Sequence, residues 1–141
     1  AELLADFATI TDRSERAELL IETADRFAEV QVPPEVAQPP YAEDRRAPAC
    51  ESDAYVWAED QPDGTLRYRF AVLNPQGLSA KAFSVIVGET LSGAPLEQVA
   101  AVPDEVVFSL FGRELTMGKG AGLMGILALV RHEAQKRLKV R

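Results

Sequence analysis

The chain carries a single cysteine, Cys50, and the chemistry open to that residue sets the range of functions to consider. One cysteine forms no internal disulfide and does not by itself build a zinc or iron-sulfur cage. It is therefore either a reactive thiol or an inert buried side chain. Residues 46–50 read R-A-P-A-C, and proline among small residues seldom builds a core, so we favour a loop that presents a thiol.

Charged residues on both sides of the cysteine act on its thiol in opposite directions. Arg45 and Arg46 precede it and would lower the pKa of the thiol, whereas Glu51 and Asp53 follow it and would raise that pKa. The sequence leaves the net direction open.

His132 is the only histidine, so any Cys-His or Ser-His-Asp arrangement would have to use it. It falls in the last turns of a basic helical segment, and nothing in the sequence places it beside Cys50. We favour a surface histidine near a helix end. A metal site is disfavoured as well, because there is no second histidine or cysteine.

A glycine-rich stretch, residues 117–122, reads M-G-K-G-A-G. It lacks the Ser or Thr and the spacing of a phosphate loop, and it is not G-x-G-x-x-G. Free backbone N–H groups at a helix start beside Lys119 would make a modest anion site. We favour instead a loop-to-helix joint in which the glycines permit close packing.

The pattern of apolar residues predicts one domain over residues 1–141, built as an α+β fold in which helices cover a small antiparallel hairpin sheet. An amphipathic helix is expected over residues 11–30, followed by a proline-rich segment to residue 40. Strands over 54–59 and 65–73 flank an Asp-Gly turn. The β-branched run over 78–91 fits either a strand or a helix, and its length and the flanking Gly77 and Gly93 favour a buried helix. Helices are also expected between Pro103 and Gly112 and from about 119 to 137.

The second strand should present two different faces to its surroundings. The residues expected on the buried face are Leu66, Tyr68, Phe70 and Val72, and those expected on the wetter face are Arg67, Arg69 and Ala71. Along the last helix, the residues expected in the core are Leu123, Ile126, Leu127, Val130 and Ala134.

The net charge of −7 makes nucleic acid an unfavourable partner, since phosphate binding needs surplus Lys and Arg. Residues 1–64 carry a net charge of −11 and residues 65–141 a net charge of +4. The basic excess lies at the end of the last helix, where positive charges interact favourably with the helix dipole.

The longest nearly uncharged stretch, residues 91–102, is too short to cross a membrane. A lone cysteine without an export signal predicts a cytoplasmic protein.

Two segments resemble the SufE/CsdE family of sulfur acceptors. Residues 46–57 read R-A-P-A-C-E-S-D-A-Y-V-W, similar to the family's R-V-x-G-C-x-S/N-x-V-W, and residues 115–123 resemble its closing L-T-x-x-R-x-x-G-L. The resemblance covers about residues 7–135 and implies that the α+β fold is of the SufE/NifU-like type. Ala49 replaces the usual glycine and would be strained if that position needs a positive φ. Lys119 replaces the usual arginine, which keeps the charge but loses the bidentate fork.

The resemblance implies a sulfur carrier rather than an enzyme in its own right, with no cofactor of its own. Cys50 would accept persulfide sulfur from a PLP-dependent cysteine desulfurase of the SufS/CsdA type and deliver it to an iron-sulfur scaffold. Arg46, Glu51 and Lys119 would contact the partner. The sequence does not decide between a monomer and a homodimer.

Two other functions remain to be separated from sulfur transfer. The same fold could act as a regulator that docks on the desulfurase without carrying sulfur. A thiol peroxidase or hydrolase is disfavoured, because no histidine candidate lies near Cys50. For a carrier, we expect Cys50 on a loop directly before the first strand of the hairpin, partly sheltered by apolar neighbours.

Overall fold

The computed structural model describes residues 13–50, 52–75, 77–112 and 117–140, and the side chains of residues 13, 14 and 117–119 are not described. The elements in chain order, where η denotes a 3₁₀ helix, are α2 (Arg13–Ala24), η1 (Phe27–Glu29), η2 (Glu43–Arg45), β1 (Ala54–Asp60), β2 (Leu66–Val72), α3 (Leu78–Leu91), α4 (Leu96–Ala100), α5 (Glu105–Phe111) and α6 (Met117–Lys139).

The hairpin of β1 and β2 is antiparallel, with Ala54 opposite Val72 and Asp60 opposite Leu66. The side chain of Asp63 in its turn accepts hydrogen bonds from the backbone N–H and the hydroxyl of Thr65, at 3.0 and 2.6 Å. Gly64 follows with φ +86°, a conformation that glycine adopts without steric cost. The predicted hairpin and its Asp-Gly turn are confirmed.

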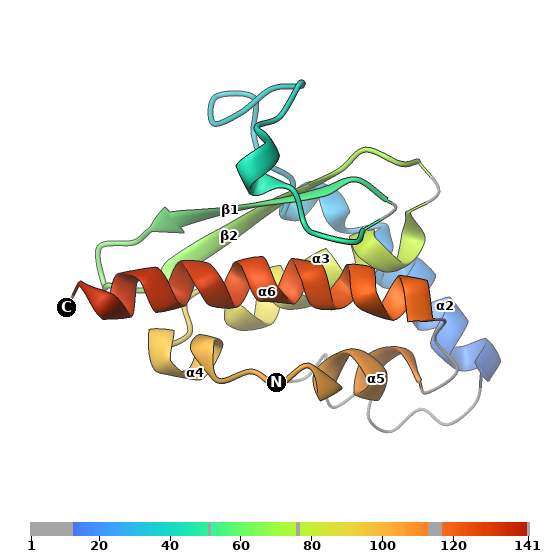
Figure 1. Ribbon diagram of the computed structural model, residues 1–141. Coiled ribbons are helices and arrows are strands. Elements are labelled where there is room, and N and C mark those ends of the chain that lie inside the picture. Colours follow the sequence, from blue (N-terminus) through green and yellow to red (C-terminus); the bar gives the residue numbers. More distant parts are fainter. Residues whose placement is uncertain (1–12, 51, 76, 113–116, 141) are drawn as a thin grey trace.

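Helices cover one face of this hairpin (Figure 1). Helix α3 packs on β2 and α6 packs on β1, while α2 lies against α3 and α4 lies against α6. Most of the largest fully buried side chains come from the hairpin, α3 and α6, and they include Tyr68, Phe70, Phe83 and Ile126. The predicted α+β fold is confirmed.

The observed helices follow most of the predicted ones, and one α-helix was not predicted. The helix expected over residues 11–30 is shorter, because α2 ends at Ala24 and residues 27–29 form the 3₁₀ helix η1. The segment 78–91 is helical over its whole predicted length, and α6 starts two residues before position 119 and ends two residues after 137. All five α6 residues expected in the core are buried. Helix α4 was not predicted, because it has only five residues and follows Gly93 and Pro95, which are typical loop residues.

The outer face of the hairpin is also covered, which the alternating pattern did not indicate. The chain after α2 folds back so that Val32, Ala37 and Tyr41 pack against Tyr55 and Trp57 of β1. The ring centroid of Tyr41 lies 5.1 Å from those of both Tyr55 and Trp57. Edge and tilted ring contacts of this kind stabilise a cluster beyond the area that they bury.

Ala71 belongs to this outer cluster and is only 2% exposed. The prediction that Ala71 lies on a wetter face was therefore wrong, although Arg67 on the same strand is exposed as expected. The reason is a tertiary contact that the strand pattern does not encode. A strand pattern shows which residues alternate, but it does not show that a distant proline-rich segment will fold over the second face.

Ala71→Glu tests this covered face. We expect the free energy of unfolding to fall by at least about 2 kcal/mol, because the new carboxylate is buried without a partner. Leu73→Glu is the matched control: Leu73 lies two residues further along and is 47% exposed, so its replacement should change stability by less than about 0.5 kcal/mol. Urea unfolding followed by circular dichroism measures both, and equal losses would contradict the covered face.

Candidate functional site

Cys50 lies on the loop between η2 and β1, three residues after Ala47 and four before the strand begins. Its residue is 7% exposed and joins the same hydrophobic cluster as Val56 of β1 and Leu123 and Ile126 of α6. Both expectations for this residue, a loop directly before the first strand and a sheltered side chain, are confirmed by its position.

The cysteine loop rests directly on α6, and two glycines of that helix make the contact possible. A Cβ atom on Gly122 would lie 3.2 Å from the Cα of Cys50 and 3.4 Å from the carbonyl oxygen of Ala49. A Cβ atom on Gly125 would overlap the carbonyl oxygen of Pro48. Any larger residue would push the loop away, since the obstruction is backbone.

Close packing by the glycine-rich segment was the favoured interpretation of the sequence, and Gly122 fits it. Gly125 was not singled out, although the signal was present. Glycines three residues apart lie on one face of a helix, and glycine is a poor helix former. Such a pair inside an otherwise apolar helix indicates that another backbone approaches that face.

The loop is also attached on both sides of the cysteine to the hairpin. Upstream, the N–H of Ala47 donates to the carbonyl of Ala54 at 2.8 Å. Downstream, the N–H groups of Leu73 and Asn74 donate to the carbonyls of Asp53 and Ser52, at 3.1 and 3.2 Å. Cys50 therefore lies near the middle of a short arch, formed by residues 47–50 and 52–53, whose two ends are hydrogen-bonded to β1 and to the residues that follow β2.

An ion pair closes the base of this arch. The guanidinium of Arg46 donates to the carboxylate of Asp53 at 2.6 Å, and both side chains are more than two-fifths exposed. The hydrogen bond to Asp53, together with its charge, raises the pKa of Arg46. Arg46, expected to contact a partner, is thus engaged within the chain in this state. An exposed pair of this kind contributes little to stability, so a competing carboxylate can displace it.

Two residues of the arch have left-handed backbone angles. Ala49 has φ +60° and Asp53 has φ +51°. Aspartate tolerates this region through local hydrogen bonds, whereas alanine pays a steric cost of roughly 1 kcal/mol for it. Ala49 occupies the position where the resembled motif has glycine, and the positive φ explains why glycine suits that position.

The structure describes the remaining candidate residues only in part. Lys119 is in the first turn of α6, one turn before Gly122, and its side chain is not among those described. Glu51 and the pair Leu115 and Thr116 lie outside the described residues. His132 is exposed, and with Pro48 it lines a surface hollow of about 470 Å³ beside α4.

The guanidinium of Arg45 pairs with Glu133 of α6 at 3.6 Å, so both arginines upstream of Cys50 direct their charge at carboxylates. Over the ranges that the structure describes, no group of three or more His, Cys, Asp and Glu side chains is arranged to hold a metal ion. The chemistry that this arrangement offers directly is that of the thiol.

The described helices include none that is long and apolar enough to cross a membrane. The fold and the site together define an α+β protein that carries one sheltered cysteine on an arch seated on its last helix. The family model for SufE, the Fe-S metabolism associated domain, matches residues 1–134, and the chain belongs to this family. Its class of function is therefore iron-sulfur metabolism.

A solved structure supports the same fold. The solution structure of a hypothetical protein from Thermus thermophilus is 27% identical in sequence, with a TM-score of 0.69. The match covers 98% of this chain and 94% of that one. A search of curated protein sequences found no match.

Ala49→Gly tests the strain at the arch. We expect the free energy of unfolding to rise by about 0.5–1 kcal/mol, because glycine adopts φ +60° without the Cβ clash. Ala42→Gly is the control, since Ala42 has φ −66° and an exposed side chain, and there glycine only adds freedom to the unfolded chain. That variant should lose stability. A loss for Ala49→Gly in the same urea titration would refute the strained backbone.

Proposed function

We propose that the protein is a sulfur carrier, which accepts persulfide sulfur on Cys50 from a PLP-dependent cysteine desulfurase and passes it to an iron-sulfur scaffold. The observation that carries the proposal is the placement of the only cysteine, sheltered in an arch between α6 and the hairpin, in a chain of a family tied to iron-sulfur metabolism.

The transfer needs only the thiol of Cys50 and the persulfide of the donor. The thiolate of Cys50 attacks the outer sulfur of the desulfurase persulfide, and a new S–S bond forms as the donor's S–S bond breaks. The desulfurase cysteine leaves as a thiolate. The proton that Cys50 gives up is balanced by the proton that this thiolate takes from solvent, so no external oxidant or reductant is consumed.

Burial of the cysteine protects the sulfur between encounters. A thiol in solution would attack an exposed persulfide and release its sulfur as sulfide, whereas a group in the core is shielded from such attack. Because this chain has no other cysteine, the persulfide also cannot collapse into an internal disulfide. A carrier with one sheltered cysteine suits this requirement.

Burial also means that Cys50 must emerge when the donor arrives. Two described features hold the arch closed: the exposed ion pair between Arg46 and Asp53, and the backbone hydrogen bonds to the hairpin at its two ends. The strained backbone of Ala49 opposes them. We propose that a carboxylate of the desulfurase replaces Asp53 as the ion-pair partner of Arg46, which loosens the arch at its base. Glu51 and Lys119 are proposed to contact the same partner.

The decisive measurement is mass spectrometry of the protein after incubation with cysteine and a purified desulfurase. We expect the peptide that contains Cys50 to gain the mass of one sulfur atom, and the gain to disappear on reduction. Cys50→Ser should abolish both this gain and the stimulation of desulfurase turnover. If Cys50→Ser still stimulates turnover, the protein is a docking regulator rather than a carrier.

A second test concerns Lys119, at the start of α6, where the helix dipole and the side-chain charge both favour an anionic partner group. Lys119→Ala should reduce persulfide transfer at subsaturating protein by about fivefold to tenfold, the loss of one charged contact. Lys119→Arg should preserve or improve it. Unchanged transfer in Lys119→Ala, with an unchanged circular dichroism spectrum, would reject a docking role for this residue.

A further inference from the structure

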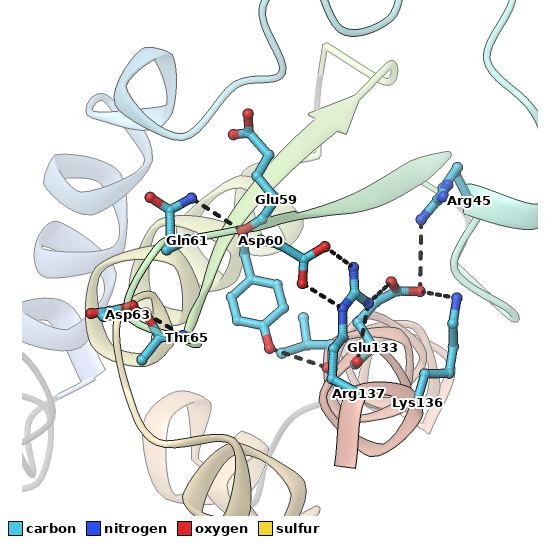
Figure 2. Close-up of polar contacts among 11 residues, drawn as sticks. Arg45, Glu59, Asp60, Gln61, Asp63, Thr65, Glu133, Lys136 and Arg137 are labelled. Carbon is cyan, nitrogen blue, oxygen red and sulfur yellow. Dashed lines mark hydrogen bonds and ion pairs between the residues drawn. The ribbon is translucent and has the colours of Figure 1, made fainter. Parts of the chain in front are cut away.

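Figure 2 shows a cluster of ion pairs that joins α6 to Asp60 of β1 and to Arg45, which precedes the cysteine arch. Its centre is Glu133, whose side chain is only 9% exposed. The carboxylate accepts hydrogen bonds from Arg137 and, at 3.3 Å, from Lys136, and it pairs with Arg45 at 3.6 Å. Arg137 in turn donates to both carboxylate oxygens of Asp60 at the end of β1, at 3.1 and 3.2 Å.

Glu133 is charged at neutral pH despite its burial. Burial raises the pKa of this carboxyl group, but hydrogen bonds from Arg137 and Lys136 and the charges of both outweigh that effect, so the pKa lies below its ordinary value. Two of its three partners lie on α6 itself, at the spacing of ordinary intrahelical pairs. Arg45 is the exception, because it comes from the chain that leads to Cys50.

Glu133 lies on the same face of α6 as the two glycines that contact the cysteine arch. Gly122, Gly125 and Glu133 lie within about 80° of the helix circumference, so all three face the same side. Along this stripe, Gly122 meets Cys50, Gly125 meets Pro48 and Glu133 meets Arg45. The chain from residue 45 to residue 50 thus runs antiparallel to α6 and is held to it at three points (Figure 1).

We infer that Glu133 is a positioning residue for Cys50: through Arg45 it anchors the upstream end of the cysteine arch to α6. Arg45 ends η2, and Arg46 continues in an extended conformation into the arch. Because Arg45 is held by Glu133, only the residues after Arg45 can move away from α6. This restraint favours the resting position of Cys50 against Gly122. The consequence for sulfur transfer rests on the proposed function, but the anchoring itself does not.

The rate at which a polyethylene-glycol maleimide modifies the protein tests the inference without any desulfurase. Cys50 is the only thiol, so the rate reports how often this residue emerges. Arg45→Gln should raise the rate by about twofold to fivefold, as expected for loss of one partly exposed ion pair. Glu133→Gln should raise it by a similar factor, and the double variant should be no faster than the faster single variant.

Two variants separate anchoring from general loosening. Arg45→Lys keeps the charge and should react at nearly the unmodified rate. Asp60→Asn breaks the pairing with Arg137 in the same cluster without touching Arg45, so it should leave the rate unchanged even where it lowers the free energy of unfolding. Arg45 is about one-third exposed, so its variants should fold even if Glu133→Gln does not.

An unchanged rate for Arg45→Gln would overturn the inference, as would effects of the two single variants that multiply in the double variant. An Asp60→Asn rate as fast as that of Arg45→Gln would also overturn it, because the cluster would then act only through stability. A faster rate combined with no sulfur on Cys50 in the mass spectrum would support the anchoring and reject the proposed carrier function.

Discussion

The backbone contact between the cysteine arch and α6 is the constraint on which the rest of the site depends. Cys50 is sheltered because Gly122 and Gly125 let the arch descend onto the helix surface. The approach is backbone against backbone, so no neighbouring side chain can rearrange to make room for a larger residue. Glycine within a helix costs roughly 1 kcal/mol relative to alanine, and at these positions that cost is offset by the burial of the arch.

The arch packs closely on α6, but the contacts that hold its base together are weak. Its contact with α6 is apolar and close-packed, and its ends are tied to the hairpin by backbone hydrogen bonds. Its closure depends on an exposed ion pair and includes an alanine in a left-handed conformation. Segments that must move for function are drawn from the less stable parts of a fold. This combination suits the proposed carrier function, in which a sheltered thiol would have to meet a partner enzyme.

The hairpin serves as the frame that holds the arch and α6 in register. Strand β1 continues directly from the arch, packs on α6 and is joined to the end of that helix by the pair of Asp60 and Arg137. The outer face of the hairpin is closed by Tyr41, Tyr55 and Trp57, so the frame is covered on both sides. A two-stranded sheet is marginal alone, and this double cover stabilises it.

Most of the local secondary structure could be predicted from the sequence, because helices and hairpins are specified by residues close together in the chain. The spacing of apolar residues predicted α6, and the length of the run between Gly77 and Gly93 favoured a helix over a strand for α3. The Asp-Gly pair predicted the turn at Gly64, and Pro48 among small residues predicted a loop at Cys50. Only the tertiary structure placed Gly125 beneath Pro48, Glu133 beside Arg45 and Ala71 beneath a distant proline-rich segment. These contacts join residues far apart in sequence, and no local pattern encodes which of the available faces will meet.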